Sequence, residues 1–570
     1  MFGPRPTRLV AALAAAAVAV LAACTADDDT PPGRAGTATA VARCAPELEA
    51  ALGAWARAGF SGSVAISTDG RVDCMAGYGS ANDATGTPIT VDTVFSIGSI
   101  TKSVTAATVL DLAAKGRLGL DDRVGRFLPG LTGPVAGVTV RQLLLHTSGL
   151  TGSHGQDHRP LARDAALAAI SGLDLAFPPG TGYVYSNAGY TLLGLVIEAV
   201  SGQSYREYTA STILRLPGGR VAGGFWDGAP AAPGPRAVGY LDGGRTGEPG
   251  DFAGPHWALD GNGGLAMTMR DLADWTRALF TGRLVPPAAV EVIRVPGHDL
   301  GHGRAETPGW VAVDASVLGT AFLASAGGGG DVGHDAVVAW VPERRRVVAL
   351  ASNRPGVSAE ELLRRVGPAL LAGKPLPTPV ESPVDAGPSA GGAAVPGRYE
   401  LPTGGTFAVT TAGNQVTVAA TGADAVAALF PPRAGTPAGD VGAHERRVLA
   451  LLAGRTTEGR KEREALEDAL GPVRDVRLAG TLVREGELRT YVSLTAGTRS
   501  VTGWYAVNDE GGLEAAEVPT DPPALRFVPA GGRYRPHDPA GTEPEVTVQF
   551  RGGRMTVSGP AGAATAERAG

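Results

Sequence analysis

The sequence has little lysine, little cysteine and no surplus of positive charge. Only four of its 50 basic residues are lysines, namely Lys102, Lys115, Lys374 and Lys461. Arginine stays charged inside proteins, whereas a buried lysine can lose its proton, so each lysine invites a functional explanation. The formal net charge of −6 gives no electrostatic reason to expect a nucleic-acid partner.

Long apolar runs are also lacking, with one exception near the start of the sequence. Residues 9–23 are apolar and follow Arg5 and Arg8. About fifteen residues are too few for a comfortable membrane span but suit the hydrophobic region of a secretory signal peptide. The run ends in Leu-Ala-Ala-Cys, which resembles the lipobox of bacterial lipoproteins. This predicts a lipid on Cys24 that anchors the protein to the outer face of the cytoplasmic membrane, in the cell envelope. The alternative is a plain secretory signal with a chance cysteine.

The sequence contains three cysteines, and the predicted lipid would occupy one of them. Cys44 and Cys74 then remain as an even pair in an oxidising compartment. We predict a disulfide between them; the alternative is two buried free thiols. No cluster of histidines and cysteines lies at metal-ligand spacing around them, so a metal site is not expected there.

Stretches rich in proline, glycine and small polar residues divide the chain. Its 44% hydrophobic and 19% charged residues are ordinary for globular proteins. Gly397-Arg398-Tyr399 and Gly532-Arg533-Tyr534 each open a segment of short strands, an internal echo typical of hairpins in a small barrel or a repeated module. The predicted division is a signal peptide (1–23), a tether (24–43), a main domain (44–373), a Pro-rich linker (374–394), a first β-hairpin or barrel segment (395–435), an α+β segment (436–528) and a second β-hairpin or barrel segment (529–570).

The first chemical signal lies in the main domain, where strands alternate with helices. Ser99 and Lys102 stand three residues apart at the start of a helical run, so they share one face of its first turn. A helix N-terminus favours developing negative charge, and a desolvated neutral lysine can take the proton of a serine hydroxyl. Such spacing also arises by chance, so the pair alone is only suggestive.

A second signal follows in a loop rich in proline and glycine. Tyr185 and Asn187 lie two residues apart, directly before an apolar helix that begins at Ala188. Side chains so spaced ahead of a helix can project into one cleft. Between the two signals stands Leu-Leu-Leu-His-Thr-Ser-Gly-Leu, residues 143–150.

With these landmarks in this order, residues 60–353 resemble the serine β-lactamase-like superfamily. The resemblance is closest to the branch of class C β-lactamases, D-alanyl-D-alanine carboxypeptidases and related esterases. It implies a mixed α/β (α+β) sheet flanked by helices, with a helical subdomain and the active site between them. It also implies Ser99 as nucleophile, Lys102 as its activating partner and Tyr185 as a second proton-transfer group, with Asn187 orienting the substrate and Lys102. Neither a metal nor an organic cofactor is implied.

The sequence departs from the family at the third motif, a Lys-Thr-Gly or His-x-Gly triplet on a strand beside the active site. Counting back without gaps from His334 places glycines 327–329 there, so the cation is missing. That cation normally helps to hold a substrate carboxylate, so its loss disfavours penicillins and D-Ala-D-Ala peptides relative to neutral esters. The resemblance implies the Ser99 N–H as one oxyanion donor and Gly330 as the second. His334 and His302 are the histidines that could approach the gap.

Other histidines receive structural interpretations. His154, Asp157 and His158 have a spacing seen in zinc sites, but the glycine and proline among them favour a polar loop. His146 lies in a segment that is more often structural than catalytic. We therefore predict no metal site.

The sequence thus predicts a serine hydrolase that acts through an acyl-enzyme on Ser99. A small ester, an amide or a cell-wall peptide is the expected substrate, with an esterase or D-Ala peptidase-like activity rather than efficient β-lactam hydrolysis. The alternative is a non-catalytic envelope lipoprotein that binds cell-wall peptide or a partner through a retained pocket. The C-terminal third shows no catalytic constellation, and binding of an envelope component is its expected role.

Overall fold

A computed structural model describes most of the chain after residue 42. The described residues are 43–157, 159–241, 246–247, 254–328, 332–379, 394–412, 415–431, 438–484, 487–508, 511–538, 544–560 and 562–569. They belong to one unit of the fold, Val41–Gly570. The predicted signal peptide, Cys24 and nearly all of the tether lie outside them, as does much of the Pro-rich linker. Within the described ranges, no helix is long and apolar enough to cross a membrane.

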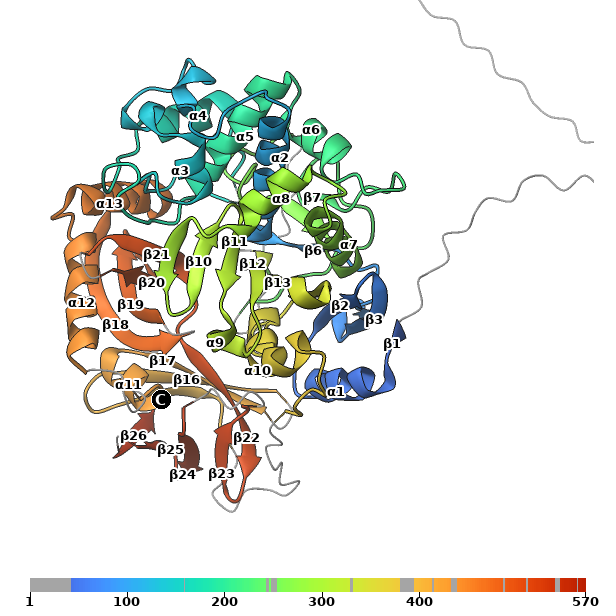
Figure 1. Ribbon diagram of the computed structural model, residues 1–570. Helices are drawn as coiled ribbons and strands as arrows, with labels where there is room; N and C mark the ends of the chain where they lie inside the picture. Colours follow the sequence, from blue (N-terminus) through green and yellow to red (C-terminus); the bar gives the residue numbers. More distant parts are fainter. Residues whose placement is uncertain are drawn as a thin grey trace, which may run out of the picture. The chain divides into compact units, whose positions relative to one another are not determined.

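The main domain is built on a nine-stranded antiparallel sheet with the order β1-β3-β2-β14-β13-β12-β11-β10-β9 (Figure 1). Its strands are β1 (Arg43–Cys44), β2 (Gly62–Thr68), β3 (Arg71–Tyr78), β9 (His298–Gly301), β10 (Arg304–Thr307), β11 (Trp310–Val313), β12 (Phe322–Gly327), β13 (Asp335–Val341) and β14 (Arg346–Ser352). The first strands of the domain therefore pair with its last ones, so the sheet is complete only when both ends of the domain are present.

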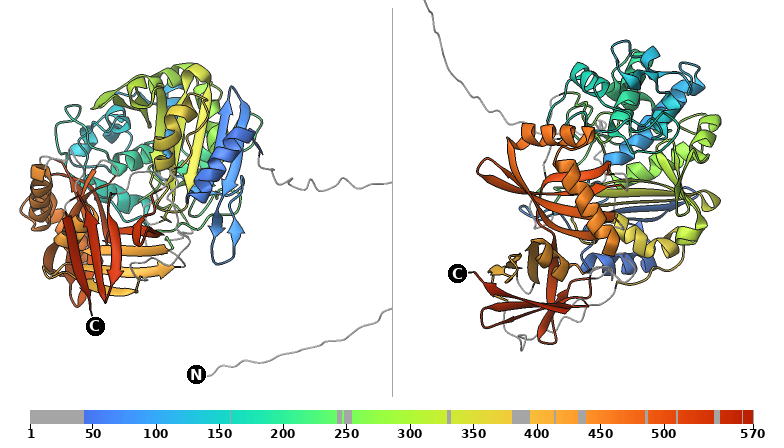
Figure 2. Two further views of the ribbon diagram at one scale, coloured as in Figure 1. Left: turned by 90° about the horizontal axis from the view of Figure 1, so that it is seen from below. Right: turned by 90° about the vertical axis from the view of Figure 1, so that its left-hand side faces the viewer.

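Alternating apolar side chains bury both faces of the sheet. Along β13, Val337 and Ala339 face one hydrophobic cluster while Val338 and Trp340 face the other. The helices α1 (Pro46–Arg57) and α10 (Ala359–Leu371) cover the first face, and α7 (Met269–Phe280) packs on the second. Figure 2 shows the sheet between these layers. This sandwich makes β2, β13 and β14 the rigid centre of the domain.

The second face also carries the helical subdomain that completes the site. Its helices are α2 (Thr101–Ala114), α3 (Val140–Leu144), α4 (Arg163–Ser171), α5 (Asn187–Ser201) and α6 (Tyr205–Thr212), with α8 (Pro287–Arg294) nearby and α9 (Ala315–Leu318) after β11. Every residue of α2 from Thr101 to Leu112 is buried, so this helix runs through the core rather than along the surface. The predicted mixed α/β fold with a helical subdomain is thus confirmed.

Small sheets connect these layers near the start of α2. One has three strands, β6 (Phe95–Ser96), β8 (Leu265–Met267) and β7 (Gly224–Phe225); the other pairs β4 (Ser80–Asn82) with β5 (Thr87–Pro88). Because β6 pairs with β8, the residues before Ser99 are tied to the segment that precedes α7.

The C-terminal third contains a closed eight-stranded barrel. Its strands, in order around the barrel, are β15 (Gly397–Glu400), β16 (Thr406–Ala412), β17 (Gln415–Thr421), β22 (Ala524–Ala530), β23 (Arg533–Pro536), β24 (Thr547–Arg551), β25 (Arg554–Gly559) and β26 (Gly562–Arg568). Figure 2 shows the two early orange strands, β16 and β17, together with the red strands. Aromatic side chains fill the interior, among them Tyr399, Phe407 and Phe527. The two predicted β segments therefore form one barrel.

A separate α+β element is inserted between β17 and β22. It comprises α12 (Ala438–Leu452), α13 (Thr457–Leu470) and a four-stranded sheet of β18 (Val473–Arg484), β19 (Glu487–Ala496), β20 (Arg499–Val507) and β21 (Leu513–Thr520), while α11 (Ala423–Leu429) follows β17. The predicted boundary at residue 528 differs from the structure, because β22 belongs to the barrel rather than to the inserted element. Strand periodicity alone does not say which sheet a strand joins.

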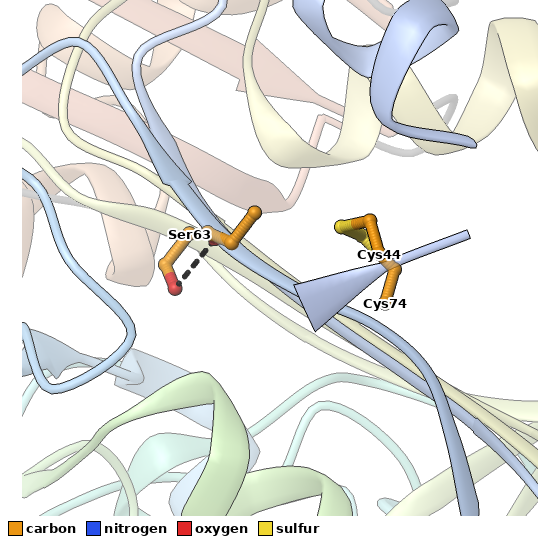
Figure 3. The surroundings of a disulfide bond; sticks show 4 residues. Cys44, Ser63 and Cys74 are labelled. Atoms are coloured by element: carbon orange, nitrogen blue, oxygen red, sulfur yellow. Dashed lines mark hydrogen bonds between the residues drawn. A yellow bond between two sulfur atoms is a disulfide. The ribbon is translucent and has the colours of Figure 1, made fainter. Parts of the chain in front are cut away.

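A disulfide joins Cys44 of β1 to Cys74 of β3 (Figure 3). The two cysteines are direct partners in the antiparallel register of these strands. Cys74 is buried against α1 and β2. The bond thus fastens a two-residue edge strand to its neighbour.

Candidate active site

Ser99 lies in the turn between β6 and α2. Residues Gly98–Ile100 form a single 3₁₀ turn, and Gly98 has a φ of 47°, which favours glycine. Thr101 accepts a hydrogen bond from the backbone N–H of Leu265 through its Oγ1, which ties the first turn of α2 to β8. Ser99 is therefore held at the N-terminus of a buried helix, where the helix dipole favours negative charge.

Lys102 reaches Ser99 from the next turn of the helix. Its Nζ lies 3.0 Å from Ser99 Oγ and 2.9 Å from the backbone carbonyl oxygen of Asn262, and the side chain is 3% exposed. Burial lowers the pKa of Lys102 to about 7, although the charges of Asp157 and Glu306 partly oppose this. A neutral amine that can accept the serine proton is therefore populated near neutral pH.

The carbonyl that holds Lys102 belongs to a rigid buried segment. Asn262 donates from Nδ2 to Thr191 Oγ1 and to the carbonyl oxygen of Ala258. Two residues earlier, Asp260 accepts paired hydrogen bonds from the buried Arg206 at 2.9–3.1 Å. Breaking such a buried pair costs about 3–5 kcal/mol, so this segment fixes the position of the lysine amine.

Tyr185 approaches Ser99 from the loop before α5. Its hydroxyl donates to Ser99 Oγ at 2.9 Å, and Lys102 Nζ lies 4.7 Å from the ring centroid. Desolvation raises the pKa of Tyr185 above its ordinary value of 10. The phenol therefore stays protonated at neutral pH and is available as a proton donor, and Tyr185 is 47% exposed.

His146 supports the ring of Tyr185 from behind. The two rings stack with centroids 4.4 Å apart, and His146 Nδ1 accepts a hydrogen bond from the N–H of Ser186 at 2.9 Å. Burial lowers the pKa of His146 well below its ordinary value, so the ring is neutral. The structure therefore gives His146 a packing role.

The remaining predicted site residues lie as follows. Asn187 begins α5 and is exposed, and the amine of Lys102 is bonded to Ser99 and Asn262 rather than to Asn187. Gly330 lies outside the described residues. In β12, the strand expected to carry the third motif, Ser325 Oγ lies 2.8 Å from Ser103 Oγ of α2.

The two histidines expected near the third motif lie in different surroundings. His334 is buried between Phe95 and Trp226, and its Nδ1 accepts the N–H of Ser96. Burial lowers the pKa of His334 to about 4, so it is uncharged at neutral pH. His302 lies exposed in the turn after β9.

The histidine-rich loop differs from its predicted form. His154 is 7% exposed, with Nε2 3.0 Å from the carbonyl oxygen of Trp257, so it is a buried residue rather than one on a polar surface. Asp157 is exposed, and His158 lies outside the described residues. No group of metal-ligating side chains occurs in the part of the chain that the structure describes.

Two further residues near the catalytic groups were not predicted from the sequence. Asn262 contributes through a backbone carbonyl, which no side-chain pattern can signal. Glu306 is a buried carboxyl on β10, the strand next to the edge strand β9, and it accepts a hydrogen bond from Tyr183. It is far from the motifs in sequence, and only the pairing of the edge strands brings it close.

The glycine at the end of β12 determines how closely this strand approaches the nucleophile. A Cβ on Gly327 would lie 2.1 Å from the carbonyl oxygen of Ile97 and 2.8 Å from the backbone nitrogen of Ser99. We expect Gly327→Ala to destabilise the domain by about 1–3 kcal/mol, because the nucleophile turn must move. Acylation of Ser99 should slow by about tenfold or more as its N–H shifts.

The adjacent glycine provides a matched control. A Cβ on Gly328 would meet nothing within 4 Å, so Gly328→Ala should retain both stability and reactivity. Thermal midpoints and the rate of fluorophosphonate labelling measure the two effects. Equal behaviour of both variants and the unmodified chain would contradict the close approach.

The chain is similar in sequence and fold to several known proteins. Residues 47–371 match the family described as Beta-lactamase. The chain is 27% identical to penicillin-binding protein 4* of Bacillus subtilis (strain 168) over 363 residues, 60% of this chain and 78% of that protein. It is 37% identical to penicillin-binding protein 4 of Amycolatopsis lactamdurans over 151 residues, which are 25% of this chain and only 39% of the relative. Among solved structures, it is similar to an octameric penicillin-binding protein homologue from Pyrococcus abyssi, with 20% identity and a TM-score of 0.49 over 91% of this chain and 99% of the other.

Proposed function

The chain belongs to the β-lactamase family, whose members are generally serine hydrolases, and on this basis we propose that it hydrolyses its substrate through an acyl-enzyme on Ser99. The observation that carries the proposal is the convergence of two groups on one oxygen. Lys102 Nζ and Tyr185 OH lie 3.0 and 2.9 Å from Ser99 Oγ. An oxygen so placed loses its proton easily and is stabilised as it becomes negative.

The two groups divide the proton transfers. Neutral Lys102 takes the proton of Ser99 as Oγ attacks the substrate carbonyl, and the Ser99 N–H stabilises the oxyanion. Tyr185 gives its proton to the departing alcohol or amine and recovers one from Lys102. Water then attacks the acyl carbon and gives a proton to neutral Lys102; the bond between that carbon and Ser99 Oγ breaks, and Oγ takes the proton back from Lys102. The high pKa of Tyr185 suits a donor, and the pKa of Lys102 near 7 suits a base.

We further propose an esterase or D-Ala peptidase-like activity rather than efficient β-lactam hydrolysis, with neutral esters preferred over substrates that carry a carboxylate. Two observations support this preference. The sequence has glycines where the family has the cation of the third motif, and His334 is uncharged at neutral pH, so no positive charge is provided there for a substrate carboxylate. The apolar run before Cys24 supports a place in the cell envelope through a lipid on that cysteine.

Reagents of different charge test the proposal. The purified chain is incubated separately with a fluorophosphonate and with a penicillin, and the adducts are located by intact-mass and peptide mass spectrometry. We expect one fluorophosphonate adduct on the peptide that contains Ser99, faster turnover of a neutral ester than of the penicillin, and no labelling of urea-unfolded chain. Absence of any adduct on folded protein would overturn the hydrolase and leave the non-catalytic binding protein.

A further inference from the structure

The edge hairpin of the main sheet contacts the loop that carries Tyr185. In the antiparallel pairing of β9 and β10, His298 lies directly opposite Glu306, so both side chains point to the same face. The ring of Tyr183 stacks on His298, with centroids 5.3 Å apart and planes at 13°. The hydroxyl of Tyr183 donates to Glu306 Oε2 at 3.1 Å. The hairpin thus holds both the face and the tip of this ring.

Tyr183 is coupled to Tyr185 through a shared neighbour. The two tyrosines are two residues apart, and both rings pack on His146, with centroids at 6.0 Å for Tyr183 and 4.4 Å for Tyr185. His146 in turn accepts the N–H of Ser186. A shift of Tyr183 therefore moves the backbone and the ring that bring the Tyr185 hydroxyl to Ser99.

We propose that Glu306 is a positioning residue. Together with His298 it fixes Tyr183, and Tyr183 in turn keeps the Tyr185 hydroxyl in place on Ser99. This arrangement supports catalysis only while Glu306 is uncharged. The proposal rests on the proposed function, because it concerns the same nucleophile. Glu306 is 5% exposed and lies among groups whose charge changes during the reaction. The titratable groups facing it are Lys102 from α2, Tyr183 and Tyr185 from the loop, Tyr190 from α5 and His298 from β9.

The charge state of Glu306 gives the proposal a pH signature. Burial raises the pKa of Glu306 to about 8, whereas burial lowers the pKa of Lys102 to about 7. Between these values both groups are neutral, so the base is available and no carboxylate lies beside it. Above pH 8 the carboxylate disfavours negative charge on Ser99 Oγ and favours protonated Lys102. The labelling rate should therefore rise through about pH 7 and fall through about pH 8.

Two variants separate the charge of Glu306 from its hydrogen bond. Glu306→Gln keeps an oxygen that accepts from Tyr183 but cannot ionise. We expect its fluorophosphonate labelling rate to match the unmodified chain near pH 7 within about threefold, and to stay level above pH 8. Tyr183→Phe keeps the ring but removes the donor, and it should slow labelling about tenfold at pH 7.5 because Tyr185 is less well placed.

The controls identify which proposal fails. Asp299→Asn removes one carboxylate from the same hairpin at an exposed position, and it should keep the whole bell-shaped profile. Thermal midpoints at each pH show that the variants are folded. If the unmodified chain labels Ser99 but Glu306→Gln keeps the fall above pH 8, or Tyr183→Phe labels at the unmodified rate, the role of Glu306 is overturned. If the unmodified chain does not label at all, the proposed function itself fails.

Discussion

Ser99→Ala is expected to abolish the fluorophosphonate adduct and to lower kcat/KM for a neutral ester by at least about 10⁴-fold. The variant removes the oxygen on which Lys102 and Tyr185 converge at 3.0 and 2.9 Å. No acyl-enzyme can then form, and the remaining groups provide only binding and oxyanion stabilisation. Intact-mass spectrometry and an ester assay at pH 7.5 measure the two losses.

Ser103→Ala is the matched control for this variant. Ser103 is a buried serine one turn further along α2, where its hydroxyl donates to the carbonyl oxygen of Gly309 at 2.8 Å. Its loss should cost about 1–3 kcal/mol of stability, because the carbonyl of Gly309 loses its buried partner, and should leave labelling of the folded protein unchanged. An adduct that persists in Ser99→Ala would mean that another residue is the nucleophile.

Lys102→Arg is expected to slow acylation by about 10³-fold and to remove the rise of activity through pH 7. Arginine keeps its charge, so it cannot take the proton of Ser99. In the unmodified chain the reactive form has neutral Lys102, so the rate rises with pH as the amine loses its proton at about pH 7. A pH series of labelling rates measures both effects.

Two further variants control for charge and for folding. Lys115→Arg changes the lysine at the other end of the same helix, which is half exposed and paired with Asp111, and it should behave as the unmodified chain. Lys102→Met places a neutral side chain of similar length at this buried position. It should fold, and its acylation should be as slow as that of Lys102→Arg. Near-normal acylation in Lys102→Met would contradict the role of Lys102 as base.

Local pattern was sufficient to predict much of the main domain. The sequence pattern predicts a helix over residues 269–280, which is α7 with the same bounds, and a strand over 62–67, which is β2 with one more residue. These segments have clear apolar periodicity and strong boundary residues. Ser99, Lys102 and Tyr185 were identified from motif order, and the structure brings their functional atoms within hydrogen-bond distance.

Features that depend on distant pairing were not predictable in the same way. The barrel requires β17 to pair with β22 across the inserted element, and no local pattern specifies that partner. Glu306 reaches the site because β10 lies next to β9 at the sheet edge, and Asn262 acts through its carbonyl oxygen. The burial of His154 likewise depends on the segment near Trp257, about a hundred residues later.

The disulfide between β1 and β3 has a mechanical consequence. A force applied to the chain before Arg43 acts first on β1. Without the disulfide, the two residue pairs that join β1 to β3 would separate one after the other. The covalent bond between Cys44 and Cys74 instead passes the load to β3, which is paired along its length with β2. There the hydrogen bonds that pair β3 with β2 over the whole length of both strands share the load. A chain held by its N-terminal segment would thus resist stretching in oxidising surroundings and yield at its first strand once the bond is reduced.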